Sequence, residues 1–146
     1  MDSLYEYLLK AWILFGDEEY FEMFLEGYDV VEKYVRWDPW FADVNLESGQ
    51  VVLPHFSSLQ LFWPGLQVLF GDLDEAHRLI SSISKILDNV DFFPEAFNLQ
   101  NGNIIAGKEG YPLRPEFIES LWYLYRATKE ERWLRLGSRI VDSLQK

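Results

Sequence analysis

One short motif occurs twice and organises the sequence. The residues Leu-Phe-Gly-Asp stand at positions 14–17 and again, 55 residues later, at 69–72. Each copy separates two stretches in which apolar residues recur every three or four positions, the period of an amphipathic helix. A third junction of this kind lies at Thr128-Lys129, about 56 residues further on. This repeat of helix, tight turn, helix and variable return segment predicts a helical solenoid or an α/α toroid.

The apolar period also predicts where the helices of three hairpins lie. The expected ranges are 3–15 with 17–35, 56–70 with 73–90, and 115–127 with 130–144. Asp17 should cap the second helix, and Gly71-Asp72 should end the third and cap the fourth. Pro64-Gly65 predicts a kink or a loosened turn inside the third helix.

Two return segments do not have a helical pattern. Apolar residues on either side of Glu47-Ser48-Gly49 predict a turn between two short strands within 37–54. The segment 91–112 is rich in Asn, Gly and aromatic residues, and irregular loops of that length usually carry functions. The predicted fold is therefore all-α: one domain over residues 1–146, forming part of an α/α toroid of about three hairpin units with a small β-hairpin insertion. In a closed toroid the first helix of each hairpin starts on the same face, so functional residues should lie together near residues 2–3, 54–58 and 113–119. The return segment 91–112 should lie over the same rim.

Composition limits the classes of partner. The chain has 146 residues, 49% of them hydrophobic, which is enough for a sizeable core and excludes intrinsic disorder. The net charge of −11 argues against nucleic acid or an anionic membrane as a partner, because both would be repelled. There is no cysteine, so disulfides and thiolate chemistry are excluded. We expect no secretory leader and no membrane segment in this stretch, although a longer parent chain could carry one.

Longer motifs resemble a known family. Residues 2–10, which begin Asp2-Ser3-Leu4-Tyr5, and residues 113–128, which begin Leu113-Arg114-Pro115-Glu116, resemble the class I α-1,2-mannosidases, glycoside hydrolase family 47. Residues 62–72 and the pair Pro94-Glu95 look more like one branch of it, the endoplasmic-reticulum (ER) degradation-enhancing α-mannosidase-like proteins. The resemblance covers nearly the whole chain.

The resemblance implies a fold and an activity. Members of this family form an (α/α)7 barrel and remove α-1,2-linked mannose from N-glycans with inversion, using carboxylates and a bound calcium ion. The implied setting is glycoprotein quality control in the ER lumen, and the implied partner is the oligomannose N-glycan of a glycoprotein. The chain resembles only the middle of the barrel, without the family's upstream acid or the Thr that holds calcium. We therefore expect no metal ligand in this chain and no activity from it alone.

Roles follow by position in the motifs. Asp2 and Glu116 match essential carboxylates, and Glu116 matches the base that activates water. Matches to substrate-binding positions fall on Arg114, Glu95, Glu119, Glu6 and Ser58. At Ser58 the processing mannosidases have a His, and this departure favours the degradation-enhancing branch. Inverting hydrolysis needs two carboxyl groups about 6.5–9.5 Å apart, so residues distant in sequence must converge.

Each of these residues also has a structural interpretation. Asp2 could cap the first helix, and Pro115-Glu116 suits any helix start. Arg114 is unfavourable just before a helix start and suggests an anionic partner such as Glu116. Other interpretations stay open for three kinds of residue. Glu95 could have a raised pKa among Phe92, Phe93 and Phe97, as a general acid requires, or it could point to water. Glu119 could lie on a solvated face. The aromatic residues Phe97, Tyr111 and Trp63 could each stack on a sugar or belong to the core.

Two other functions remain compatible with the sequence. The acidic bowl could bind oligomannose without cleaving it, as a lectin does. The repeat could also be a helical scaffold with no sugar site, although a scaffold does not need the polar cluster of Asp2, Arg114, Glu116 and Glu119.

Overall fold

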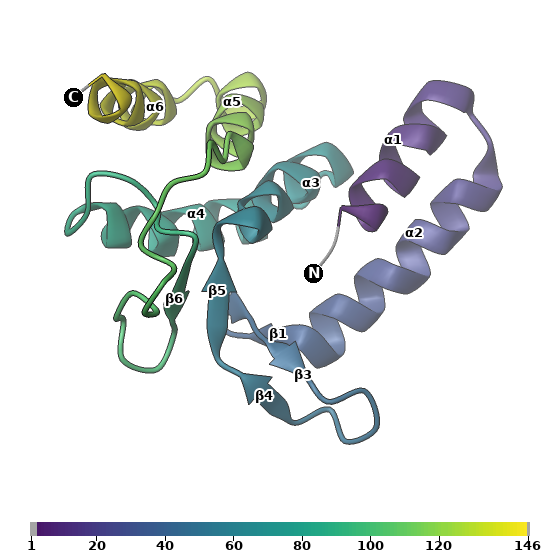
Figure 1. Cartoon of the computed structure of the whole chain (residues 1–146). Coiled ribbons are helices and arrows are strands. Elements are labelled where there is room, and N and C mark those ends of the chain that lie inside the picture. Colours follow the sequence, from purple (N-terminus) through teal and green to yellow (C-terminus); the bar gives the residue numbers. More distant parts are fainter. Residues whose placement is uncertain (1–2, 146) are drawn as a thin grey trace. The chain divides into compact units, whose positions relative to one another are not determined.

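The computed structural model describes residues 3–145 and is mostly helical, with short two-stranded sheets (Figure 1). The chain divides into two compact units, one ending at His55 and the other beginning at Phe56. The predicted all-α class with a small β insertion is confirmed. No helix in the described part of the chain is long and apolar enough to cross a membrane.

The first unit contains the first helical hairpin. Helix α1 (Leu4–Phe15) ends at Gly16, whose φ of 70° is left-handed and suits glycine, and α2 (Glu18–Val30) continues into a π-helical turn at Val31–Val35. The Asp17 side chain accepts a hydrogen bond of 3.1 Å from the Glu19 N–H, so the predicted cap is confirmed. Trp12 stacks on Phe21 at 4.2 Å between ring centroids and joins the two helices.

Two small hairpins follow in the same unit. Strands β3 (Asp43–Val44) and β4 (Val51–Leu53) pair antiparallel, as the turn residues predicted. The Asn45 side chain accepts hydrogen bonds from the Glu47 and Ser48 N–H groups and closes this turn. The pair β1 (Arg36–Trp37) and β2 (Trp40–Phe41) was not predicted, because strands of two residues are too short for an alternating pattern to show.

The second hairpin begins differently from the prediction. Phe56 lies in strand β5 (His55–Ser57), a 3₁₀ helix follows at Ser58–Phe62, and α3 (Trp63–Phe70) comes only then. The helical turns start two residues later than Phe56 because Ser57 and Gln60 form a capping box, which begins them at Ser58. The helix changes from 3₁₀ to α geometry between Phe62 and Trp63, and Pro64 lies in the first turn of α3, where its missing N–H costs nothing.

The remaining elements complete the repeat. Gly71, with a φ of 100°, separates α3 from α4 (Leu73–Leu87), and Lys129, with a left-handed φ of 59°, separates α5 (Glu116–Thr128) from α6 (Glu131–Leu144). The three junctions lie where the spacing predicted turns, and each contains a left-handed residue. The long return segment contributes strand β6 (Ala96–Asn98), which pairs with β5.

The core of the second unit forms where α3 packs between α4 and α5. Trp63, Ile80 and Leu124 are fully buried there. At the closest approach of α3 and α5, the Ser120 hydroxyl accepts a hydrogen bond of 2.9 Å from the Gly65 N–H and donates one of 2.6 Å to the Leu61 carbonyl. This contact fixes the start of α3 against the first turns of α5.

Candidate functional site

Three of the predicted site residues contact one another in the second unit. Arg114 donates two hydrogen bonds to the Glu95 carboxylate, from Nε to Oε2 at 3.0 Å and from Nη2 to Oε1 at 2.8 Å. The Ser58 hydroxyl lies 3.3 Å from the same Oε2. A bidentate pair of this kind fixes both the position and the plane of the carboxylate.

The main chain brings these residues together. The Ser58 N–H donates to the Glu95 carbonyl at 3.0 Å, which continues the β5–β6 pairing by one step. On its other side, the Glu95 N–H donates to the Gly110 carbonyl at 3.0 Å. Main-chain hydrogen bonds therefore hold the Glu95 backbone on both sides, independently of the contacts that its side chain makes.

Arg114 is positioned by the turn before α5. The Tyr111 hydroxyl donates a hydrogen bond of 2.9 Å to the Arg114 carbonyl, and the Tyr111 ring stacks on Phe92. Leu113 has a left-handed φ of 53°, a conformation that costs a residue other than glycine roughly 1–2 kcal/mol. This turn stores strain beside the site while it directs Arg114 toward Glu95.

The charge state of Glu95 corrects one interpretation. The hydrogen bonds from Arg114 hold the pKa of the Glu95 carboxyl below its ordinary value of 4.5, against a smaller opposing effect of burial. The possibility that aromatic neighbours raise this pKa is therefore wrong. Because Glu95 stays ionised, it suits the binding of hydroxyl groups better than proton donation. The hydrogen bonds to Glu95, together with the negative charge of that carboxylate, in turn raise the pKa of Arg114.

Glu116 lies beside this cluster, at the first residue of α5. Its negative charge contributes to the raised pKa of Tyr111, after the larger effect of burial, and to that of Arg114. Its Oε2 atom is buried and has no hydrogen-bond partner among residues 3–145. A buried carboxylate oxygen without a partner is costly, and such atoms commonly mark a position where a ligand or water binds. Glu119, one turn further along α5, is half-buried.

The other predicted residues lie apart from this cluster or outside the described chain. Asp2 lies outside the described residues. Glu6 is buried in the first unit, with its carboxylate 2.5 Å from the Lys10 ammonium. Trp63 and Phe97 are both buried, so only Tyr111, of the three aromatic candidates, has ring surface to offer a sugar.

Sequence reasoning missed two residues that shape the site. Ser120 ties α5 to the start of α3, and the available signal was the repeat, because Ser120 follows Gly65 by the same 55 residues that separate the motifs. Lys108, in the return segment, lies close enough to Glu95 for its charge to help lower the pKa of that carboxyl. A single lysine in a polar loop gives no signal in the sequence.

Calcium is the metal that the resemblance implied. It takes six to eight oxygen ligands, several of them carboxylates. The described residues contain no group of three or more His, Asp or Glu side chains that could hold a metal ion. These residues do not by themselves fit a calcium site.

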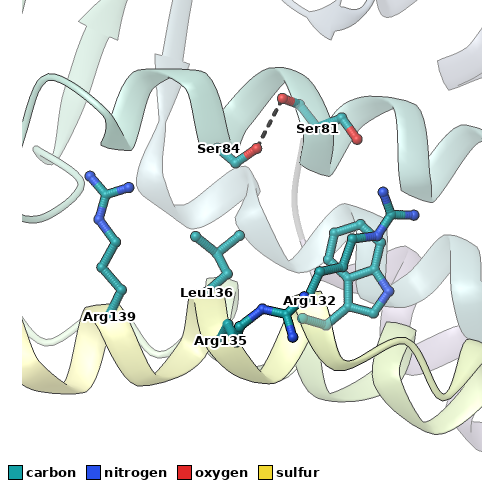
Figure 2. Close-up of a pocket in the computed structure, with 7 residues that line it drawn as sticks. Ser81, Ser84, Arg132, Arg135, Leu136 and Arg139 are labelled. Carbon is teal, nitrogen blue, oxygen red and sulfur yellow. Dashed lines mark hydrogen bonds between the residues drawn. The ribbon is translucent and has the colours of Figure 1, made fainter.

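The described part of the second unit has hollows on its surface, two of which are relevant here. One, of about 420 Å³, is lined by Glu95 and by residues 107–112 without Glu109. The other, of about 360 Å³, lies between α4 and α6 and is lined by Ser81, Ser84, Arg132, Trp133, Arg135, Leu136 and Arg139 (Figure 2). Its lining offers hydroxyl, guanidinium and apolar groups but no carboxylate, so it lacks the acids that glycoside hydrolysis requires.

Comparison with known proteins identifies the family. The sequence model of glycosyl hydrolase family 47 matches residues 1–146. The chain belongs to this family. It is 50% identical over 145 residues to alpha-mannosidase I MNS4 of Arabidopsis thaliana, covering 99% of this chain and 23% of that protein. It is 42% identical over 146 residues to the human ER degradation-enhancing alpha-mannosidase-like protein 2, covering 100% of this chain and 25% of that protein.

A more distant relative carries a similar name. The ER degradation-enhancing alpha-mannosidase-like protein 1 of Saccharomyces cerevisiae is 36% identical over 161 residues, covering 99% of this chain and 20% of that protein. The family and the degradation-enhancing branch that the motifs indicated are thus confirmed. This family-47 chain spans about a quarter of the length of the first two of these relatives and a fifth of the third.

Proposed function

We propose that the cluster at the start of α5 is part of an α-1,2-mannosidase-type site that acts on oligomannose N-glycans in the ER, within a toroid of helical hairpins. The observation that carries the proposal is the buried, unpartnered Oε2 of Glu116 beside the Arg114–Glu95 pair. Family membership and the names of the relatives support the substrate class and the compartment.

Glu116 is the proposed base. In an inverting glycosidase, one carboxylate removes a proton from the water that attacks the anomeric carbon. A base must lie within hydrogen-bond reach of the proton that it removes, and the unpartnered oxygen of Glu116 can accept that bond without breaking another.

The neighbouring groups are proposed to bind the sugar. Arg114 uses Nε and Nη2 on Glu95, which leaves its other N–H donors for hydroxyl groups. The Glu95 oxygens have further lone pairs that can accept from hydroxyl groups, and Ser58 can both donate and accept. Because the pair holds its geometry without a ligand, little conformational freedom is lost when sugar binds.

The second carboxyl group and the metal complete the proposal. Asp2 remains the proposed partner of Glu116, on its position in the motif at residues 2–10. Calcium, where the family's site holds it, would supply a hard cation for sugar hydroxyls. Glu119 and Glu6 stay proposed pocket residues on the same grounds of position.

Binding and turnover test the proposal separately. We expect the chain to bind α-1,2-mannobiose, measured by calorimetry. Arg114→Met should weaken binding by removing the donors and releasing Glu95, whereas Glu116→Gln keeps the shape of the site and should keep binding. Mannose release from an oligomannose glycan is expected only from an assembled site, and any release should be lost in Glu116→Gln.

A matched control excludes a general effect of charge. Arg135→Met removes an arginine of α6 that is 71% exposed and distant in sequence from the cluster. Equal binding by Arg114→Met and Arg135→Met, or no binding by the unchanged chain, would refute the site. Binding without release, even by an assembled site that contains this chain, would instead support a lectin-like role.

A further inference from the structure

The hollow between α4 and α6 brings positive charge to one surface of an acidic chain. It has a volume of about 360 Å³, and its lining includes two serines of α4 and, from α6, Arg132, Arg135 and Arg139. Figure 2 shows Leu136 and Arg139 extending from α6 toward α4. Among the residues that the structure describes, the lining has no carboxylate, although the net charge of the chain is −11. This surface therefore favours an anionic occupant.

The three arginines lie on one face of α6 and are available to a partner. They follow one another at steps of three and four residues, the spacing of neighbours on a helix surface, and all three are exposed. Each has a nearby acid, in the pairs Arg132–Glu130 at 2.6 Å, Arg135–Glu131 at 3.2 Å and Arg139–Asp88 at 2.9 Å. Exposed ion pairs of this kind contribute little to stability, so a second carboxylate can share or replace the first.

Helix α2 carries a complementary acidic face. Glu22, Glu26 and Asp29 follow one another at steps of four and three residues and are exposed. Within residues 3–145 their carboxylates have no hydrogen-bond or ion-pair partner. Carboxylates four residues apart on a helix repel each other, so this face is stabilised when cations lie against it.

The two faces match when the helices run in opposite directions. From Arg132 the charges of α6 follow after three and then four residues, and from Asp29 backwards the charges of α2 do the same. At the rise of an α-helix these steps are about 4.5 and 6 Å along either axis. An antiparallel pair of helices therefore aligns all three charges, Arg132 with Asp29, Arg135 with Glu26 and Arg139 with Glu22.

Apolar residues lie on matching flanks of the two charged faces. In α2, Met23 and Val30 each follow an acidic residue of the face and are half-exposed, at 49% and 50%. In α6, Trp133 and Leu136 each follow an arginine and line the hollow. One residue is about 100° around a helix, so both apolar pairs lie on the same flank of their charged face. In an antiparallel pair the same flanks face each other, which places Met23 and Val30 toward the hollow.

We propose that the hollow between α4 and α6 binds α2 of a second copy of this chain, in an antiparallel helix contact. Three ion pairs specify the register, and Met23 and Val30 supply apolar area. None of the residues proposed to bind or cleave sugar takes part, so this inference is independent of the proposed function. A contact held by a few exposed ion pairs is weak and sensitive to salt.

Sedimentation equilibrium of the whole chain over a range of concentrations tests the contact. At low salt the average mass should rise above that of one chain as concentration increases, and at about 1 M salt, where the screening length is about 3 Å, it should fall back. Arg135→Glu and Glu26→Arg each replace an attraction by a repulsion and should weaken association about two- to thirtyfold, twice the worth of an exposed ion pair. The double variant, which exchanges the two charges, should restore association.

Two variants control for the change in net charge. Arg126→Glu on α5 and Glu47→Arg in the β3–β4 turn change exposed residues outside the contact by the same charge and should leave association unchanged. The proposal is overturned if the unchanged chain sediments as a monomer at every concentration, or if Arg135→Glu associates as strongly as Arg126→Glu. A double variant that associates no better than the two single variants would also refute the pairing, because far-UV circular dichroism can show that all these variants keep their helices.

Discussion

The close approach of α3 and α5 makes a sharp prediction for Gly65→Ala. A Cβ atom at Gly65 would lie 2.9 Å from the Ser120 hydroxyl oxygen, 3.1 Å from the Tyr123 ring and 3.3 Å from the Ser120 Cα. The first distance is too short for a stable contact, and the third involves backbone that cannot rotate away. The Ser120 hydroxyl is itself held by the Gly65 N–H and the Leu61 carbonyl. The helices must therefore separate, or Ser120 must give up its hydrogen bonds.

Two opposing contributions set the expected magnitude. Replacing glycine by alanine in a helix is favourable by at most about 1 kcal/mol. Overpacking a tight contact costs about 1–3 kcal/mol, and each hydrogen bond lost by Ser120 about 1 kcal/mol more. We expect Gly65→Ala to lower the free energy of unfolding by about 1–3 kcal/mol, because the packing cost exceeds the gain in helix propensity.

Gly137→Ala provides the matched control. Gly137 lies inside α6, and a Cβ atom there would meet nothing within 4 Å, so this change should raise stability by up to about 1 kcal/mol. Urea unfolding followed by far-UV circular dichroism and tryptophan fluorescence measures both variants. Ser120→Ala should cost less in the Gly65→Ala background than alone, because it removes the clashing oxygen. If Gly65→Ala is at least as stable as the unchanged chain, the inferred close contact is wrong.

Two further predictions concern titration near the site. Arg114 lowers the pKa of Glu95, so the stability that the pair contributes is fully present above the ordinary value of 4.5 and is lost as pH falls through the lower pKa of the folded chain. Glu95→Gln should therefore lower the urea midpoint near neutral pH, and the difference should shrink on acidification; a constant difference would contradict the pairing. The pKa of Tyr111 is raised above 10 by burial and by the charge of Glu116, so Glu116→Gln should lower this pKa. A phenolate absorbance titration measures it, with Tyr111→Phe as the blank. The control variant Glu131→Gln, on α6, should leave the pKa of Tyr111 unchanged.

The helical repeat could be predicted because its signals are local. The left-handed residues Gly16 and Gly71 interrupt the apolar pattern at the ends of α1 and α3, and the next helix begins within a few residues of each glycine. The start of the third helix differs from the prediction because a capping box and the pairing of β5 with the distant strand β6 outweigh the apolar pattern at Phe56. Such pairing involves no local signal, so it is invisible to a reading of periodicity.

The site residues could be named from motifs, but their contacts could not. Arg114 was expected to pair with an acid at the helix start, whereas its hydrogen-bond partner is Glu95, 19 residues earlier on a different segment. That partnership depends on the backbone bonds that place Glu95 between Ser58 and Gly110. The pKa of Glu95 is lowered and not raised for the same reason. The hydrogen bonds from Arg114, which the fold places beside Glu95, have a larger effect than the burial of the carboxyl.

The backbone frame around Glu95 also bears on how such a site can diverge. The bonds that join Ser58, Glu95 and Gly110 run from main-chain N–H to main-chain carbonyl and do not involve the side chains. A substitution at position 58 therefore leaves these main-chain bonds in place, but Ser58 is only 1% exposed and its hydroxyl lies against Glu95, so a replacement side chain must fit the same buried space. Divergence at this position is limited to groups of that size, and each of them changes what contacts the Glu95 carboxylate.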